Sequence, residues 1–268
     1  MALARLGHHA HLLTRIGDDE RGEAIREHLA ASGVALTPGS SVAAPTSTAQ
    51  ATLDAHGAAT YTFDLLWDPD PSGLPAQVDA VHTSSIAAVL DPGAATVGDV
   101  LRRHREHATI SYDPNARPTL MGSPAAVRER IEANIALSDV VKASDEDVAW
   151  LYGTDDVEDV VASWRALGPA LTVLTRGAEG SVGFARAGRV QVSPVEVEAV
   201  DTVGAGDTFS AGILDALAAK GLLGAERRPQ LAAIPADDVA TVLRRASALA
   251  AITVSRAGAN PPWSHELT

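Results

Sequence analysis

The sequence predicts an α/β protein in which helices cover both faces of a parallel sheet. The first observation is a series of short apolar segments that alternate with longer segments of helical periodicity across the middle of the chain. The second is the length, because 268 residues can bury a sizeable core in one large domain with a small appendage. In such a sheet, ligands bind at the carboxyl ends of the strands.

The middle of the chain supplies the elements of this sheet. Strands are expected over residues 81–85, 109–113, 140–143 and 171–174, followed by a hairpin over residues 182–192. Helices are expected over residues 93–104, 124–137, 145–152 and 156–167, with Ser144 as the N-cap of the third. Several polar motifs directly follow these strands, at the edge where ligands bind.

The segments before this region are shorter and less regular. Residues 1–7 are typical of a helix end with a glycine cap, residues 11–16 of a strand, and residues 21–32 of an amphipathic helix. Residues 46–63 alternate in polarity on both sides of an Asp/Gly turn, which predicts a hairpin.

Composition excludes several classes of partner. A formal net charge of −13 argues against binding to nucleic acid or to an anionic membrane surface. The chain has no cysteine, and we find neither a signal peptide nor a membrane-spanning stretch, so we expect a cytoplasmic protein. His8, His9 and His11 have no carboxylate or cysteine at ligand spacing, so we expect surface or strand histidines there and no metal site.

The most informative stretch is residues 194–219. Residues 194–200 are apolar and β-branched at alternate positions, as in a strand or extended chain, and residues 208–219 have helical periodicity. Between them, Gly204-Ala-Gly206 allows backbone N–H groups to converge at a helix N-terminus, where an anion can bind. Asp207 at the same place is a candidate general base. Without further context, an N-capping aspartate would explain it equally well.

The run from Asp201 to Leu214, Asp-Thr-Val-Gly-Ala-Gly-Asp-Thr-Phe-Ser-Ala-Gly-Ile-Leu, resembles the second signature of the ribokinase-like (PfkB-type) carbohydrate kinases. This resemblance implies that Asp207 takes the proton from a sugar hydroxyl. It also implies that the amides of Gly204, Ala205 and Gly206 form an anion hole for the transferred phosphoryl group. The implied fold is a three-layer α/β/α ribokinase-like sheet. Residues 1–38 and 75–268 would form the kinase domain, and residues 39–74 a small β-sheet lid.

Asp113-Pro-Asn-Ala-Arg117 follows the expected second strand and matches the D-x-N-x-R pattern of the family. The forked guanidinium of Arg117 suits a phosphate or a sugar acid. By the resemblance, Asn115 lies on the nucleotide-phosphate side and Arg117 contacts the substrate. The motif alone is also a good turn.

The next segment, Lys142-Ala-Ser-Asp-Glu-Asp147, stands where many members of the family have N-x-x-E, which orients the water shell of Mg²⁺. Alignment without gaps puts Asp147 at the glutamate, with Glu146 as the alternative. Oxygen ligands that act through water suit Mg²⁺, but an acidic first helical turn explains both carboxylates equally well.

Two further segments match the family near the nucleotide. Thr175-Arg-Gly-Ala-Glu-Gly180 resembles its T-x-G-x-x-G, which implies that Thr175, Gly177 and Gly180 lie against the phosphates of ATP. By the same resemblance, Ser247 lies near the purine. The backbone around Asp201, Val203 and residues 256–259 could hold a monovalent cation such as K⁺.

The sequence therefore predicts a kinase that uses ATP and Mg²⁺ to phosphorylate a hydroxyl of a small sugar or sugar acid. Its motifs are most similar to those of fructokinases and 2-keto-3-deoxygluconate kinases, and pairing of lids between subunits would give a homodimer. In this family, a strand with a substrate-binding aspartate and a Gly-Gly loop precede a helix like residues 1–7, and neither is found here. A second hypothesis is therefore a catalytically impaired protein that binds nucleotide or sugar. A third is an enzyme of the same fold that phosphorylates a vitamin-like alcohol.

Overall fold

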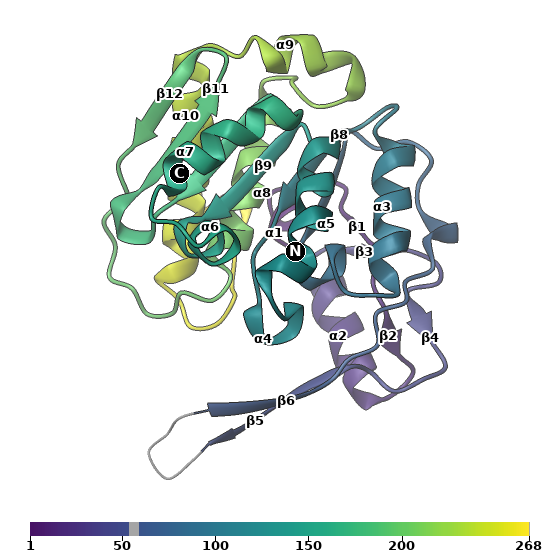
Figure 1. Ribbon diagram of the computed structural model, residues 1–268. Coiled ribbons are helices and arrows are strands. Elements are labelled where there is room, and N and C mark those ends of the chain that lie inside the picture. Colours follow the sequence, from purple (N-terminus) through teal and green to yellow (C-terminus); the bar gives the residue numbers. More distant parts are fainter. Residues whose placement is uncertain (54–58, 268) are drawn as a thin grey trace.

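The computed structural model describes residues 1–53 and 59–267. Its centre is a six-stranded sheet with the order β12-β11-β10-β9-β8-β7 (Figure 1). The strands are β7 (Ala80–Ser84), β8 (Thr109–Asp113), β9 (Val140–Ser144), β10 (Leu171–Thr175), β11 (Ser181–Ala185) and β12 (Gly188–Val192). They agree with the predicted strands and hairpin to within one or two residues at each end.

Strands β7 to β10 run parallel, and the β11–β12 hairpin extends the sheet antiparallel to β10. The register pairs Ser84 with Asp113 and Ser144 with Thr175, so the carboxyl ends of the parallel strands share one edge. Every residue of β8 is buried, as expected for a parallel strand with both faces covered. Among the described residues, β7 pairs with β8 alone, and it is partly exposed.

Four helices cover one face of the sheet. Their apolar side chains pack against those of β8 to β11 in a core that includes Leu101, Ile110, Tyr112, Ile131 and Trp164. The helices are α3 (Gly93–His104), α5 (Pro124–Leu137), α6 (Asp145–Tyr152) and α7 (Val157–Ser163), which continues as a 3-10 turn over Trp164–Leu167. Their first and last residues agree closely with the prediction.

The other face is covered mainly by α8 (Ala205–Ala219) and α10 (Ala236–Val254), with the short α9 (Arg228–Ala232) beside them. Phe209, Ile213 and Leu217 of α8 pack against the sheet together with Val242 and Leu243 of α10. Helices on both sides of one sheet make the three-layer arrangement that the sequence predicts, so the predicted fold class is confirmed. Helix α10 carries Ser247, which the sequence analysis placed near the purine, in its second half.

The N-terminal part is built from short elements: α1 (Ala2–Arg5), β1 (His11–Leu12), β2 (Ile16–Gly17), α2 (Glu20–Ala31), β3 (Ala35–Leu36) and β4 (Ser41–Val42). The single strand predicted over residues 11–16 is wrong in one respect. Its two ends pair with different partners, β1 with β3 and β2 with β4, and the chain between them belongs to neither sheet. Apolar periodicity cannot show which partner a strand finds, so this division is a tertiary effect.

A two-stranded antiparallel sheet of β5 (Thr48–Leu53) and β6 (Ala59–Asp64) extends away from the α/β body (Figure 1). The predicted hairpin is therefore present, and its predicted Asp/Gly turn lies outside the described residues. The role of residues 39–74 as a lid, and the division of the chain at those residues, stay predictions. Among the described residues, no helix combines the length and the apolar character that a membrane span requires.

Residues 194–200 form an extended connection without strand pairing, and Val195, Val197 and Val200 are exposed. Their alternating pattern leads into α8 without contributing to the sheet. The short α4 (Pro118–Met121), which follows the D-P-N-A-R motif, was not expected from the sequence.

Candidate active site

The N-terminus of α8 has the geometry of an anion site. Gly204 caps it in the left-handed region with φ of 80°, and a Cβ there would lie 2.9 Å from the Cβ of Ala259. The N–H groups of Ala205 and Thr208 find backbone acceptors, whereas those of Gly206 and Asp207 find none within the described part of the chain. Gly206 and Asp207 are exposed, so these N–H groups and the positive end of the helix dipole are open to a ligand.

Asp207 lies opposite the loop that follows β8. Its Oδ1 is 3.5 Å from Nδ2 of Asn115, a residue 92 positions earlier in the chain. This contact brings together two of the predicted site segments, the D-P-N-A-R motif and the start of α8. An exposed carboxylate is chemically able to accept a proton from a hydroxyl group that lies against it.

The loop after β8 holds Asn115 in a left-handed conformation with φ of 36°, which is uncommon for a residue other than glycine. Ser85, also left-handed with φ of 55°, donates from its Oγ to the carbonyl oxygen of Asn115 at 2.8 Å. Arg117 Nη1 donates to Asn115 Oδ1 at 2.8 Å. The sequence analysis did not identify Ser85, because its position after β7 matters only once β7 and β8 are neighbours.

Asp147 joins the loop after β9 to the loop after β8. Its Oδ2 accepts from the backbone N–H of Ser144 at 3.0 Å and completes the capping box of α6, so the predicted Ser144 N-cap is confirmed. Its Oδ1 accepts from the N–H of Ala116 at 2.7 Å. Both oxygens of Asp147 are thus used, whereas the adjacent Glu146 is exposed, and no partner of its carboxylate is found among the described residues.

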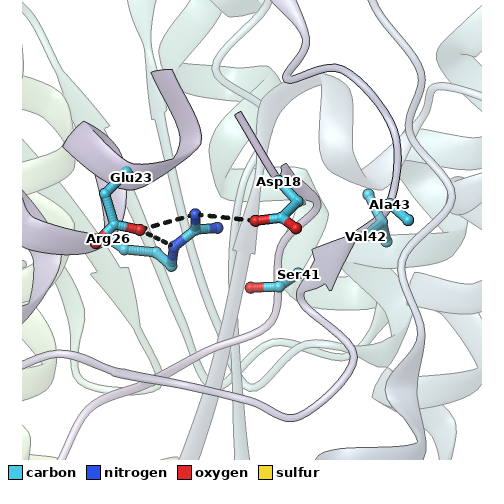
Figure 2. Close-up of a pocket in the computed structure, with 6 residues that line it drawn as sticks. All are labelled: Asp18, Glu23, Arg26, Ser41, Val42 and Ala43. Atoms are coloured by element: carbon cyan, nitrogen blue, oxygen red, sulfur yellow. Dashed lines mark hydrogen bonds and ion pairs between the residues drawn. The ribbon is translucent and has the colours of Figure 1, made fainter. Parts of the chain in front are cut away.

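These segments line a hollow of about 230 Å³, whose walls are Asn115, Ala116, Arg117, Pro118, Ser144, Glu146, Asp147 and Trp150. A larger hollow of about 400 Å³ lies elsewhere, between α2 and β4. Figure 2 shows the Arg26 guanidinium there between Glu23 and Asp18, with Ser41 nearby. The larger hollow contains none of the predicted site residues, and its arginine already has acidic partners.

A buried ion pair lies beneath the site. Lys142 Nζ is 2.7 Å from Asp113 Oδ2, and the two side chains are 5% and 1% exposed. Burial raises the pKa of Asp113, and the charge of Lys142 acts in the opposite direction. Ser210 of α8 lies 3.4 Å from the same carboxylate oxygen. The sequence analysis assigned no role to this pair, although a lysine inside an apolar strand is itself an unusual signal.

The predicted nucleotide segment Thr175–Gly180 follows β10 at the same edge of the sheet. It forms a tight turn, closed by a hydrogen bond of 2.9 Å from the N–H of Arg176 to the carbonyl of Gly180. Gly177 and Gly180 adopt positive φ of 48° and 88°. Ser247 lies in α10 and is 9% exposed. No hydrogen bond between Ser247 and the Thr175–Gly180 turn is found in the described residues, so their shared role stays a prediction.

The segments of the predicted monovalent cation site are brought together by Asp201. Its carboxylate accepts from the N–H of Val203 and of Gly258, each at 2.9 Å, and these bonds lower its pKa. Within residues 1–53 and 59–267, no group of three or more metal-binding side chains lies close enough to hold a metal ion. His8 instead pairs with Asp215 at 2.9 Å.

Comparison with known proteins gives the family. The model of the pfkB family of carbohydrate kinases matches residues 1–266. A fructokinase of Rhizobium leguminosarum bv. trifolii is 37% identical over 230 residues, which are 83% of this chain and 70% of that protein. Probable fructokinase-4 of Arabidopsis thaliana is 31% identical over 274 residues, 97% of this chain and 81% of the relative.

Solved structures agree. An aminoimidazole riboside kinase from Salmonella enterica superimposes with a TM-score of 0.77 at 26% identity, covering 96% of this chain and 83% of the other. A fructokinase from Vibrio cholerae O395, solved with fructose, ADP and calcium ion, superimposes with a TM-score of 0.78 at 25% identity, again covering 96% of this chain and 83% of the other. With the geometry at the start of α8, these similarities show that the chain belongs to the pfkB family of carbohydrate kinases.

Proposed function

We propose that this protein transfers the γ-phosphoryl group of ATP to a hydroxyl of a small sugar, with fructose as the first candidate. The observation that carries the proposal is the first turn of α8. There, an exposed carboxylate, two unpaired backbone N–H groups and the Asn115 amide meet at the carboxyl edge of the sheet. The fructokinase relatives, one of them solved with fructose and ADP, support the choice of sugar and nucleotide.

In the proposed reaction, Asp207 accepts the proton of the attacking hydroxyl. The hydroxyl oxygen forms a bond to the γ-phosphorus while the bond from that phosphorus to the β–γ bridging oxygen breaks, and ADP leaves. The anion hole for the negative oxygens of the transferred group would be formed by the N–H groups of Gly204, Ala205 and Gly206, of which that of Ala205 meets the carbonyl oxygen of Thr202 at 3.2 Å in this structure. Asn115 orients Asp207 and contacts the phosphates. Arg117 lines the hollow of about 230 Å³ together with Asn115, and it binds the sugar or the phosphoryl group.

Mg²⁺, when bound with ATP, neutralises charge on the phosphates during transfer. Glu146 fits a role in its water shell better than Asp147, because the Glu146 carboxylate is exposed whereas both oxygens of Asp147 hold backbone N–H groups. Thr175, Gly177 and Gly180 would support the nucleotide phosphates and Ser247 the purine, with K⁺ near Asp201. Residues 39–74 would cover the sugar, and their pairing would give a homodimer in the cytoplasm.

ADP production from MgATP tests the proposal against fructose, ribose, 2-keto-3-deoxygluconate, adenosine and aminoimidazole riboside. We expect fructose to give the highest kcat/KM. A higher kcat/KM for another sugar would support a sugar kinase with that sugar, rather than fructose, as its substrate. Binding of ATP without turnover of any substrate would contradict the proposal and favour the impaired binder.

A further inference from the structure

The Lys142–Asp113 pair is unusual for its place in the sheet. Val140 of β9 and Leu171 and Val173 of β10 pack into the apolar core beneath α8 and α10, and Lys142 points to this same face two residues after Val140. Burying a lysine and an aspartate costs free energy that their mutual attraction rarely exceeds, and apolar residues in their place are often at least as stable. Stability alone therefore does not explain the pair.

The ammonium of Lys142 lies directly under the first turn of α8. A Cβ at Gly206 would lie 3.1 Å from Lys142 Nζ, and apart from the local backbone no other heavy atom of the described residues would lie within 4 Å of it. Gly206 has no positive φ, so its backbone conformation does not require glycine. The close neighbour that a side chain at this position would meet is the lysine ammonium.

Charges of both signs meet at the first turn of α8. The positive end of the helix and the ammonium of Lys142 lie together, Asp207 adds a carboxylate to the same turn, and Asp113 is the acceptor found for Lys142 among the described residues. Asp113 also receives the N–H of Asn115 at 3.2 Å and lies 3.4 Å from the Ser210 hydroxyl, so its negative charge is shared. An ammonium has three donors, and those not bound to Asp113 remain beside the turn that carries Gly206 and Asp207.

We propose that Lys142 is a positioning residue for phosphoryl transfer, whose ammonium supplies positive charge to the anion hole from beneath the first turn of α8. Asp113 fixes that ammonium in place and, through Asn115, ties it to the loop opposite Asp207. Lys142 keeps its proton throughout, and the proton of the hydroxyl still goes to Asp207. This inference rests on the proposed function, since it assigns a charge to the same anion hole.

The test compares a single with a double variant. Lys142→Met leaves Asp113 buried without its partner, so both stability and activity fall. Lys142→Met/Asp113→Asn removes both charges and restores folding, which the midpoint of urea unfolding reports. With fructose and MgATP, we expect the double variant to lose about 100-fold in kcat, while KM for fructose and Kd for ATP change less than about threefold. A kcat within about threefold of wild type would reduce the pair to a structural role and overturn the proposal.

A control double variant shows whether removal of any ion pair at the ends of these strands would lower kcat in the same way. Asp139→Asn/Arg228→Met removes the ion pair at the opposite ends of the same strands, where Arg228 Nε is 2.7 Å from Asp139 Oδ1. We expect it to change the urea midpoint and leave kcat unchanged. An equal loss of kcat in the control would contradict a specific role for Lys142.

A second readout does not depend on turnover. ADP with fluoroaluminate imitates the phosphoryl group in transfer, and in the presence of fructose it should raise Tm beyond the shift given by ADP alone. The Lys142→Met/Asp113→Asn variant should keep the ADP shift and lose the additional one, and keeping both would overturn the proposal. If none of the sugars gives the additional Tm shift with the wild type, the proposed function fails on its own, separately from the role of Lys142.

Discussion

Two buried aspartates lie at opposite ends of the central strands, and their surroundings differ. Asp139, just before β9, is 5% exposed and accepts from Arg228, Arg105 and the backbone N–H of Ile110. Arg228 Nη2 donates to the carbonyl oxygens of Arg105 and Ala108. Asp113, at the end of β8, is 1% exposed and has one cation, Lys142, which lies under the open first turn of α8.

The difference shows what a buried charge does in each place. Around Asp139 every charged group has several partners within the protein, so the network joins α9 to the sheet and is complete without a ligand. Around Asp113 the network ends at a helix N-terminus, where no partner of the Gly206 and Asp207 N–H groups is found among the described residues and where the proposed phosphoryl group would bind. We therefore expect changes near Asp113 to affect catalysis and changes at Asp139 to affect stability.

The largest effect is expected at the first turn of α8, close to Asp113. Asp207→Asn removes the proton acceptor while keeping the shape of the side chain, and we expect kcat for the sugar to fall about 10³-fold with little change in Kd for ATP. Asp215→Asn, on the same helix but bound to His8 and Arg245, is the matched control and should keep kcat. A kcat within tenfold of wild type for Asp207→Asn would remove Asp207 as the general base.

At Asp139, the single variant Asp139→Asn should lower the free energy of unfolding by about 2 kcal/mol, because the two partly exposed arginines lose the charged acceptor of their hydrogen bonds. Urea unfolding measures this change, and kinetics at saturating substrate should show kcat unchanged. A lower kcat with normal stability would show that the two ends of the sheet are coupled, and the comparison would fail.

A smaller effect is expected from Gly206→Ala. The new Cβ would press on the Lys142 ammonium at 3.1 Å and shift it by a few tenths of an ångström, so we expect kcat to fall about tenfold. Gly98→Ala in α3 is the control, since its Cβ would meet only the end of the flexible Arg102 side chain among the described residues. Unchanged kcat in Gly206→Ala would show that the position of the ammonium tolerates displacement.

The smallest effect concerns an aspartate at the surface. Asp19 accepts from Thr46 Oγ1 at 2.6 Å and from the N–H groups of Thr46 and Gly22, and these bonds lower its pKa to about 2. A lowered pKa contributes stability above the unfolded value of about 3.9, and that stability is lost as the pH falls towards 2. The stability difference between wild type and Asp19→Asn in urea should therefore be constant near neutral pH and shrink below about pH 4. A constant difference down to pH 2 would contradict the role of these bonds.

The local signals in the sequence gave the elements of the fold. Helices α3, α5 and α6 have the predicted bounds, because apolar periodicity, proline at the first turn and the Ser144–Asp147 capping box act over a few residues. The run around Gly204–Asp207 likewise identified the start of α8 and its candidate base, since the order of glycine, glycine and aspartate is itself the signal. The fold class followed from the alternation of strands and helices.

Tertiary structure alone decided which distant groups meet. The left-handed Asn115 held by Ser85, the use of both Asp147 oxygens by Ala116 and Ser144, and the approach of Lys142 to Gly206 depend on which strands are neighbours and on how α8 crosses them. The division of residues 11–16 between two small sheets has the same cause. Local propensity acts within a few residues, whereas the charge and hydrogen-bond partners of a site are set by contacts between segments far apart in the chain.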